Sequence, residues 1–343
     1  MTQMTQLQSA PMPSAATRLD FLPIAVFAAF AVAPFLASSS GAEGYVLSLL
    51  TRVMIFGLAA MSLDLILGYG AMVSFGHAAF FGIGAYAVGI LASHGVEDAI
   101  IQVPVALAAS ALFAALTGAV SLRTKGVYFI MITLAFAQML YFLASSLAAY
   151  GGDDGLTLPS RSLVAGSGFL DNDFALYGAT LACLLGAYMV SRSIVGSRFG
   201  RVLRGTKENA IRMEAIGFQP FHFQLATYVI SGMMAGLAGC LLANQAEFVS
   251  PAFMTWQRSG ELIFMVVLGG LGSLHGAIIG AAAFILLEEF LPEIVHAATF
   301  FLNDDLRSRL TENWQMVFGP ILILIVLFAR GGIMGVLRRG SHG

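Results

Sequence analysis

Charged residues are scarce in this chain. Asp, Glu, Lys and Arg make up 10% of its 343 residues, whereas hydrophobic residues make up 58% and the mean hydropathy is +0.84. A soluble domain carries about 25% charged residues, so the composition excludes an ordinary soluble protein and predicts a membrane protein. Cysteine is rarer still, and we expect both Cys183 and Cys240 to be small buried hydrophobic residues rather than a disulfide or metal site.

The motifs of common enzymes are missing as well. The sequence has no G-x-x-x-x-G-K-[ST] phosphate loop and no G-x-S-x-G nucleophile elbow. Its six histidines are scattered without the spacing of metal ligands. We therefore expect no enzymatic activity, no metal site and no cofactor in this chain, and nothing in it indicates nucleic-acid binding.

Hydrophobic runs of membrane-spanning length follow one another along the chain. Because about 20 helical residues cross a hydrocarbon core of roughly 30 Å, the pattern predicts an all-α polytopic membrane protein. We expect eight to ten transmembrane helices, broken or half helices included, with ten preferred. The run at 259–271 is too short to cross unaided and is expected to be a half-helix or to continue obliquely into the next run. The candidate spans are 21–38, 45–67, 71–92, 99–120, 126–149, 174–192, 221–243, 259–271, 275–291 and 315–336.

The cationic residues are distributed unevenly between the predicted loops. With ten spans and a cytoplasmic N-terminus, twelve of the 17 Lys and Arg residues fall on the cytoplasmic side. The other five, which include Arg52 and Arg258, fall on the outer side. This positive-inside bias predicts that both termini are cytoplasmic. The tail at 1–20 is polar and predicted to be disordered, and residues 21–343 are assigned to the membrane domain.

The longest basic stretch is the predicted cytoplasmic loop at 193–220. Its second part, 208–218, has the pattern of a short amphipathic helix that Gly217 ends. The polar positions are Glu208, Asn209, Arg212 and Glu214, and the apolar positions are Ala210, Ile211, Ala215 and Ile216. The loop could be only a topological anchor, or it could hold anionic lipid headgroups. The amphipathic helix favours a third interpretation, the docking of a soluble partner.

Glycine is concentrated between Gly68 and Gly89. Because glycine costs up to about 1 kcal/mol in a helix interior, this span is predicted to be broken or tightly packed. Broken membrane helices line water-filled pathways, where their free backbone groups are satisfied. Alternatively, Ser74 and His77 bond to neighbouring carbonyls in a packed helix. The candidate pathway residues here are Ser74, Phe75, Gly76 and His77.

Three residues of the span at 126–149 are further pathway candidates. Thr133 and Phe136 are three positions apart and share one helix face, whereas Gln138 points elsewhere. Each of them could instead take part in ordinary packing between helices.

Carboxylates inside the predicted spans are few. Asp64, Glu261, Glu288 and Glu289 all fall near predicted span ends, where we expect water to reach them. A proton- or ion-coupled carrier would need a titratable group deep in the bundle. The pattern therefore disfavours such a carrier.

Six sets of motifs are specific when taken together. They are Gly68–Tyr86, Gly126–Phe129 with Thr133–Gln138, Gly151–Leu156, Gly200–Gly217, Val249–Pro251 with Met265–Ser273, and Trp314. Because it carries all six sets, the chain resembles the permeases of branched-chain amino acid ABC transporters, in particular the Liv-type M subunits. The resemblance covers most of the chain from Leu49 onward.

This resemblance implies partners and a role for the basic loop. It implies a complex in a bacterial inner membrane with a second homologous permease subunit, two cytoplasmic ATP-binding subunits and a periplasmic substrate-binding protein. ATP would be bound by the partner. The helix at 208–217 would couple to the ATPase through Glu208, Asn209, Arg212, Glu214 and Gly217. Its match to the usual E-A-A-x-x-x-G pattern is incomplete, because Ile211-Arg212-Met213 occupies the first three places.

The expected function is import of branched-chain or related amino acids by alternating access, driven by a separate ATPase subunit. A urea or short-amide importer of the same architecture is the nearest alternative. An ion-coupled secondary transporter is the alternative from a different class.

Overall fold

The computed structural model describes residues 21–40, 43–298 and 331–339, together with 316, 318–320, 323 and 324. Most of these residues are helical. The helices and strands are α1 (Phe21–Ser40), α2 (Glu43–Leu67), α3 (His77–Ser93), α4 (Ala99–Ser121), α5 (Val127–Ser146), β1 (Leu156–Thr157), α6 (Asp173–Gly196), α7 (Arg198–Ala215), α8 (Pro220–Ala246), β2 (Phe248–Val249), α9 (Trp256–Gly269), α10 (Leu274–Ala298) and α13 (Gly332–Arg339), with short 3₁₀ turns at Ala148–Tyr150, Gly152–Asp154, Phe169–Asp171 and Pro251–Met254.

The predicted all-α polytopic fold is confirmed. Within the described residues, α2, α4, α5, α6 and α8 are each long and apolar enough to span a membrane. Helices α9 and α10 form a broken span that bends by 116°. The apolar segments Leu22–Phe35 of α1 and His77–Ser93 of α3 are shorter. The half-helix expected at 259–271 is α9. The predicted span at 315–336 lies mostly outside the described residues, and the tail at 1–20 lies wholly outside them.

The predicted break near Gly68 is present and longer than expected. Helix α2 ends at Leu67, and residues 68–76 form turns and extended chain before α3 begins at His77. The predicted span start at 71 was therefore six residues too early. The reason is the local backbone: Ala71 has a φ of 55°, which does not fit a right-handed helix.

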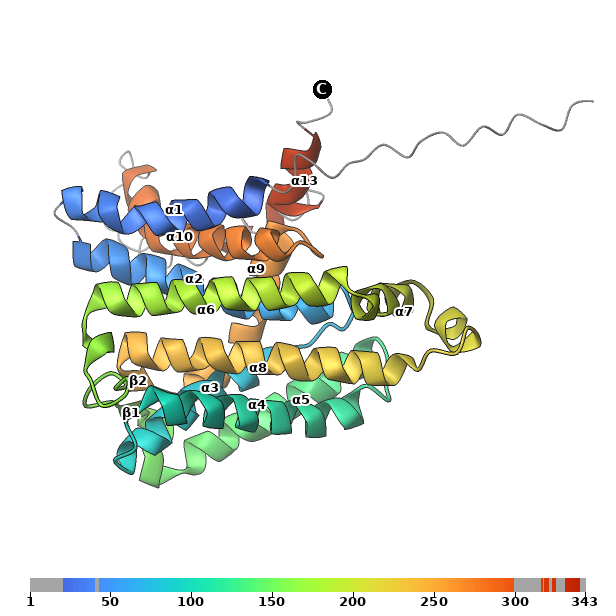
Figure 1. Ribbon diagram of the computed structural model, residues 1–343, viewed down its shortest axis with the longest axis horizontal. Coiled ribbons are helices and arrows are strands. Elements are labelled where there is room, and N and C mark those ends of the chain that lie inside the picture. The colour runs from blue at the N-terminus through green and yellow to red at the C-terminus, as the bar shows by residue number, and fades with distance from the viewer. Residues whose placement is uncertain are drawn as a thin grey trace, which may run out of the picture.

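Loops predicted to lie on the same side of the membrane meet at the same end of the bundle (Figure 1). At one end, β1 pairs with β2, and the Leu163 N–H donates to the Glu97 carbonyl at 2.8 Å. At the other end lies α7, where the Lys207 ammonium donates to the Gly68 carbonyl at 2.6 Å. The end that carries α7 is the one predicted to be cytoplasmic.

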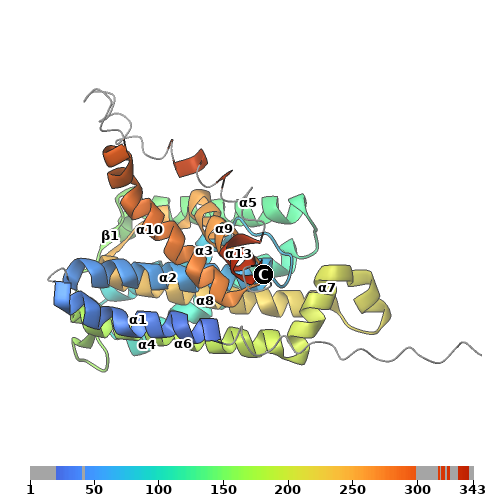
Figure 2. The ribbon, with the colours of Figure 1, turned by 90° about the horizontal axis from the view of Figure 1, so that it is seen from above.

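The core is formed where α2, α3, α4 and α8 pack together. Close packing there depends on glycine, since a Cβ on Gly84 would lie 1.8 Å from the carbonyl oxygen of Gly236. Small residues allow helix backbones to approach in this way in lipid. Seen from above, α2 and α8 run along the bundle, α10 crosses it obliquely, and α7 projects from its end (Figure 2). In this arrangement α3 packs against α8, and α9 and α10 pack against α2.

Candidate coupling and pathway site

Helix α7 is two helical segments joined at Asn209. Asn209 has φ −158° and ψ 98°, which interrupts the helix between Glu208 and Ala210. The Asn209 side-chain oxygen accepts the Arg212 N–H at 2.9 Å. This is the bond that an N-cap residue makes to its helix, so the second segment begins at Asn209. The sequence pattern placed the amphipathic helix correctly and missed the interruption.

The second segment ends as predicted at Gly217. Gly217 has a φ of +92°, which favours glycine. The Phe218 N–H donates to the Met213 carbonyl at 3.1 Å, and the Gly217 N–H donates to the Glu214 carbonyl at 3.0 Å. These two bonds define a Schellman motif. We call Asn209–Gly217 the coupling segment, a short helix capped at both ends.

The coupling segment folds back on the first part of α7 through Met213. A Cβ on Gly205 would lie 2.7 Å from the Met213 sulfur, so glycine makes room for this side chain. By contrast, Ile211 and Ile216 are 76% and 62% exposed. The predicted polar residues Glu208, Arg212 and Glu214 are exposed as well. The segment therefore presents two large apolar side chains, flanked by charges, to its surroundings.

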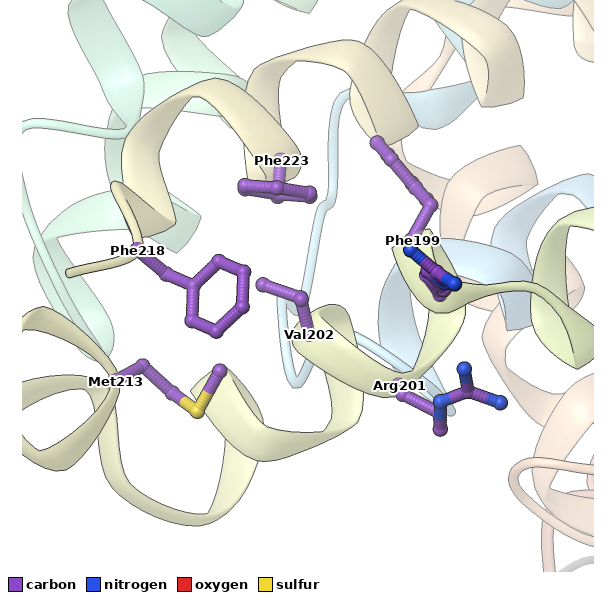
Figure 3. Close-up of a pocket in the computed structure, with 7 residues that line it drawn as sticks. Phe199, Arg201, Val202, Met213, Phe218 and Phe223 are labelled. Atoms are coloured by element: carbon purple, nitrogen blue, oxygen red, sulfur yellow. The ribbon is translucent and has the colours of Figure 1, made fainter. Parts of the chain in front are cut away.

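A cavity of about 500 Å³ lies between α7 and the start of α8. In Figure 3, Met213, Val202, Phe218 and Phe223 gather around the cavity, and Arg201 points away from Met213. The full lining is Arg198, Phe199, Arg201, Val202, Met213, Phe218 and Phe223. The cavity leaves space between the coupling segment and the end of the bundle.

One residue of α7 reaches the break between α2 and α3. The Lys207 Nζ donates to the Gly68 carbonyl at 2.6 Å. Gly68 is tightly enclosed, because a Cβ there would lie 2.2 Å from Asp64 Oδ1 and 2.4 Å from the Gly272 nitrogen. Lys207 was identified in the sequence only as part of the basic loop. Its contact depends on how the chain folds back and has no signal in the sequence.

The position of Asp64 differs from the one expected from the sequence. It is fully buried, whereas we expected water to reach it. Its Oδ1 accepts the Gly272 N–H at 2.8 Å, so the turn between α9 and α10 covers the last turn of α2. Gly272 has a φ of +74°. The sequence predicted a break in the Gly68–Gly89 stretch and a half-helix at 259–271, but not that Asp64 joins the two regions.

The candidate residues of the 68–89 stretch lie at the start of α3. Ser74 and His77 are fully buried in this chain. The His77 Nε2 lies 2.8 Å from the Ser62 hydroxyl, and Ser74 Oγ accepts the Gly76 N–H at 3.3 Å. Both side chains are thus packed inside the chain, but neither of these contacts is the bond to a neighbouring carbonyl that the packing alternative expected. Phe75 is half-buried. A role in the pathway stays a prediction.

Thr133 lies against this same region. A Cβ on Gly76 would lie 2.3 Å from the Thr133 carbonyl oxygen, so α5 contacts the start of α3 directly. The Thr133 hydroxyl donates to the Ile130 carbonyl of its own helix at 2.9 Å. Phe136 and Gln138 are half-buried. The structure therefore brings Thr133 to Gly76, and the pathway role of all three residues stays a prediction.

Charged residues of α2, α9 and α10 lie inside these helices. Arg52 is 3.6 Å from Glu288 and 3.8 Å from Glu289, and Arg258 pairs with Glu261 one turn further along α9. The placement of Arg52 and Arg258 on the outer side, and of the glutamates at span ends, stays a prediction. Helix α10 continues past the predicted end at 291, and α9 begins before the predicted start at 259. An unpaired charge at the bilayer centre costs at least about 2.5–3.5 kcal/mol, which explains the pairing.

The comparison with protein families agrees with this architecture. The family described as branched-chain amino acid transport system / permease component matches residues 45–327, most of the chain. The chain belongs to this family. This permease is thus a multi-pass membrane protein, and the family predicted from its motifs is confirmed.

Several curated proteins are similar to this permease. The high-affinity branched-chain amino acid transport system permease protein LivM of Salmonella typhimurium is 24% identical, over 89% of this chain and 72% of its own. BraD of Pseudomonas aeruginosa, with the same description, is 23% identical over 82% of this chain and 91% of its own. LivH of Escherichia coli is 28% identical over 40% of each chain. No solved structure matches the chain.

Proposed function

We propose that this permease is the membrane-spanning subunit of an ATP-driven importer for branched-chain or related amino acids. Two cytoplasmic subunits bind and hydrolyse ATP, a second homologous permease completes the pathway, and a periplasmic binding protein delivers the substrate. The complex lies in a bacterial inner membrane with both termini of this chain in the cytoplasm. The family and the descriptions of the relatives support the substrate class.

The coupling segment is the observation that supports energy supply by a partner ATPase. Ile211 and Ile216 are exposed on a helix that is capped at both ends. Large apolar side chains on a rigid, exposed element are typical of a docking surface. The charged residues Glu208, Arg212 and Glu214 surround them and would form the polar rim of that surface. An ATPase that docks there holds the segment without needing any phosphate-binding residue in this chain.

Force on the coupling segment has a short route into the bundle. Lys207, two residues before Asn209, holds the Gly68 carbonyl at the break between α2 and α3. Asp64, in the last turn of α2, holds Gly272 in the turn between α9 and α10. A movement of α7 would therefore reach both broken helices together. In the proposed mechanism this movement opens the pathway alternately to the two sides.

The buried carboxylate of Asp64 is an observation that favours an ion-coupled carrier. However, Asp64 Oδ1 is already occupied by the Gly272 N–H. Its helix also ends beside Gly68, whose carbonyl receives the Lys207 ammonium. This arrangement fits a group that fixes a turn better than a group that exchanges ions. Transport that survives loss of the ATPase subunits, and stops when an ion gradient is removed, would favour the carrier.

The coupling role is tested by replacing Glu208 and Arg212 together with alanine in the complete importer. Both side chains are exposed, and the cap of the segment uses only the backbone N–H of Arg212. We expect normal assembly and continued ATP hydrolysis but loss of amino acid uptake in vesicles. Arg123→Ala, which removes an exposed cation from another predicted cytoplasmic loop, is the control. Full transport by the double variant would refute the coupling role. Urea or acetamide uptake in place of leucine uptake would establish the alternative substrate class.

A further inference from the structure

Five charged side chains come together from three helices, and we call them the charged cluster. They are Arg52 of α2, Arg258 and Glu261 of α9, and Glu288 and Glu289 of α10. The ring of Phe56 joins its two halves, because the Arg52 guanidinium lies 6.0 Å and the Arg258 guanidinium 5.5 Å from the ring centre. Glu289 also accepts a hydrogen bond from the Tyr45 hydroxyl at 2.8 Å.

Arg52 and Glu288 of the charged cluster lie well within their helices, whereas Arg258 is the third residue of α9. Arg52 is nine residues after the start of the 25-residue α2, which is about 14 Å along the axis at 1.5 Å per residue. Glu288 is ten residues before the end of the 25-residue α10, which is about 15 Å along that axis. A hydrocarbon core is about 30 Å thick. Arg52 and Glu288 are therefore each about half that thickness away from the nearer end of their helix.

The charged cluster is partly exposed on the surface of this chain. Each side chain of its ion pairs is between 26% and 34% exposed. Lipid tails cannot solvate such groups, so ionisable residues within membrane-spanning helices face protein or water and mark substrate pathways. The exposed side of the cluster therefore belongs to a polar interior surface of the assembled transporter.

The contacts within the cluster are unequal. Arg258 and Glu261 are in direct contact, whereas the Arg52 contacts at 3.6 and 3.8 Å are too long for hydrogen bonds. The guanidinium of Arg52 can therefore still bind a carboxylate in the two-bond geometry that arginine favours. Glu288, its partner at 3.6 Å, can likewise accept from an ammonium. The cluster has three negative and two positive charges, so one carboxylate has no cation of its own.

We propose that the charged cluster binds the zwitterionic end of the transported amino acid between Arg52 and Glu288. Arg52 takes the α-carboxylate and Glu288 takes the α-ammonium, and the cargo replaces their long mutual contact. The pair of Arg258 and Glu261 fixes the polarity of the site. Phe264, one turn after Glu261 and 42% exposed, offers an apolar contact for the side chain. This inference rests on the proposed function and adds a substrate site within this chain.

The test is equilibrium binding of radiolabelled leucine to the purified permease–ATPase complex without the binding protein. Competitors are unlabelled leucine, isocaproate, which has only the carboxylate, and isoamylamine, which has only the ammonium. Leucine should compete at least about tenfold better than either analogue, because each lost charge removes a charge-assisted contact. Glu288→Gln should abolish the advantage of leucine over isocaproate, and Arg52→Gln its advantage over isoamylamine. A merely structural role would not change this selectivity.

Asp173→Asn is the matched control. It also removes a carboxylate from an arginine pair, the one with Arg161 at 2.8 Å, which lies at the β1–β2 end of the bundle. The control should keep the leucine preference. If Glu288→Gln does not assemble, Glu288→Asp is measured, and it must weaken leucine binding. A wild-type complex that does not prefer leucine, or a Glu288 variant that keeps the full preference, would overturn the site. If wild-type vesicles take up leucine with ATP and only these binding results fail, the proposed function stands and the site does not.

Discussion

Replacement of Lys207 with methionine separates ATP hydrolysis from transport most directly. Methionine keeps much of the apolar stem but removes the ammonium that donates to the Gly68 carbonyl at 2.6 Å. A hydrogen bond with one charged partner contributes about 1.5–3 kcal/mol. Because Lys207 is otherwise exposed, the lower value applies, about 1.5 kcal/mol, which is about tenfold in an equilibrium constant. We therefore expect amino acid uptake per ATP hydrolysed to fall by up to about tenfold.

The assay measures ATP hydrolysis and leucine uptake in the same vesicles containing the complete importer. Hydrolysis should change little, since Lys207 lies outside the coupling segment. Lys125→Met is the matched control, because Lys125 is the only other lysine of the chain and is exposed in the loop after α4. Lys207→Arg should retain most of the coupling. The reasoning is wrong if Lys207→Met and Lys125→Met give the same ratio of uptake to hydrolysis.

Three further predictions concern the residues that join α7 to the bundle. Gly68→Ala should lower the melting temperature of the complex by several degrees, because its Cβ would lie 2.2 Å from Asp64. Gly44→Ala, near the start of α2, adds a Cβ that meets nothing within 4 Å and should leave the melting temperature unchanged. Equal melting temperatures of the two variants would contradict the enclosure of Gly68. Asp64→Leu should destabilise the protein by about 1–3 kcal/mol by leaving the half-buried Gly272 N–H without its acceptor. Asp64→Asn keeps an acceptor and should cost less, as denaturant unfolding would show. Gly217→Ala should weaken coupling, because an alanine at a φ of +92° costs about 1–2 kcal/mol. The melting temperature of the bundle should not change, since the segment lies outside the core. Unchanged uptake per ATP hydrolysed would count against a role of the capped segment in coupling.

The sequence predicts the helices of this protein well, because its signals are local. Runs of about 20 apolar residues mark the spans, the glycines after Gly68 mark one break, and the short run at 259–271 marks the other. Gly217 marks the end of the coupling segment for the same reason, since its positive φ is a local requirement. The interruption at Asn209 was missed, because a polar residue within an amphipathic pattern does not distinguish a cap from a helix interior.

Contacts between distant residues could not be predicted in the same way. Lys207 lies 139 residues from Gly68, and Asp64 lies 208 residues from Gly272. Both acidic and basic residues near a predicted span end are normally solvated, and that rule failed for Asp64 because a turn from another helix covers it. The charged cluster emerges only when three helices are placed together.

The central claim is that ATP hydrolysis on partner subunits, acting through the coupling segment, supplies all the energy for transport. It is tested by leucine accumulation in vesicles that contain the complete importer, supplied either with ATP or with an imposed proton or sodium gradient. The account predicts accumulation above the outside concentration with ATP alone, unaffected by ionophores, and none with a gradient alone. Accumulation driven by a gradient in the absence of ATP would contradict it.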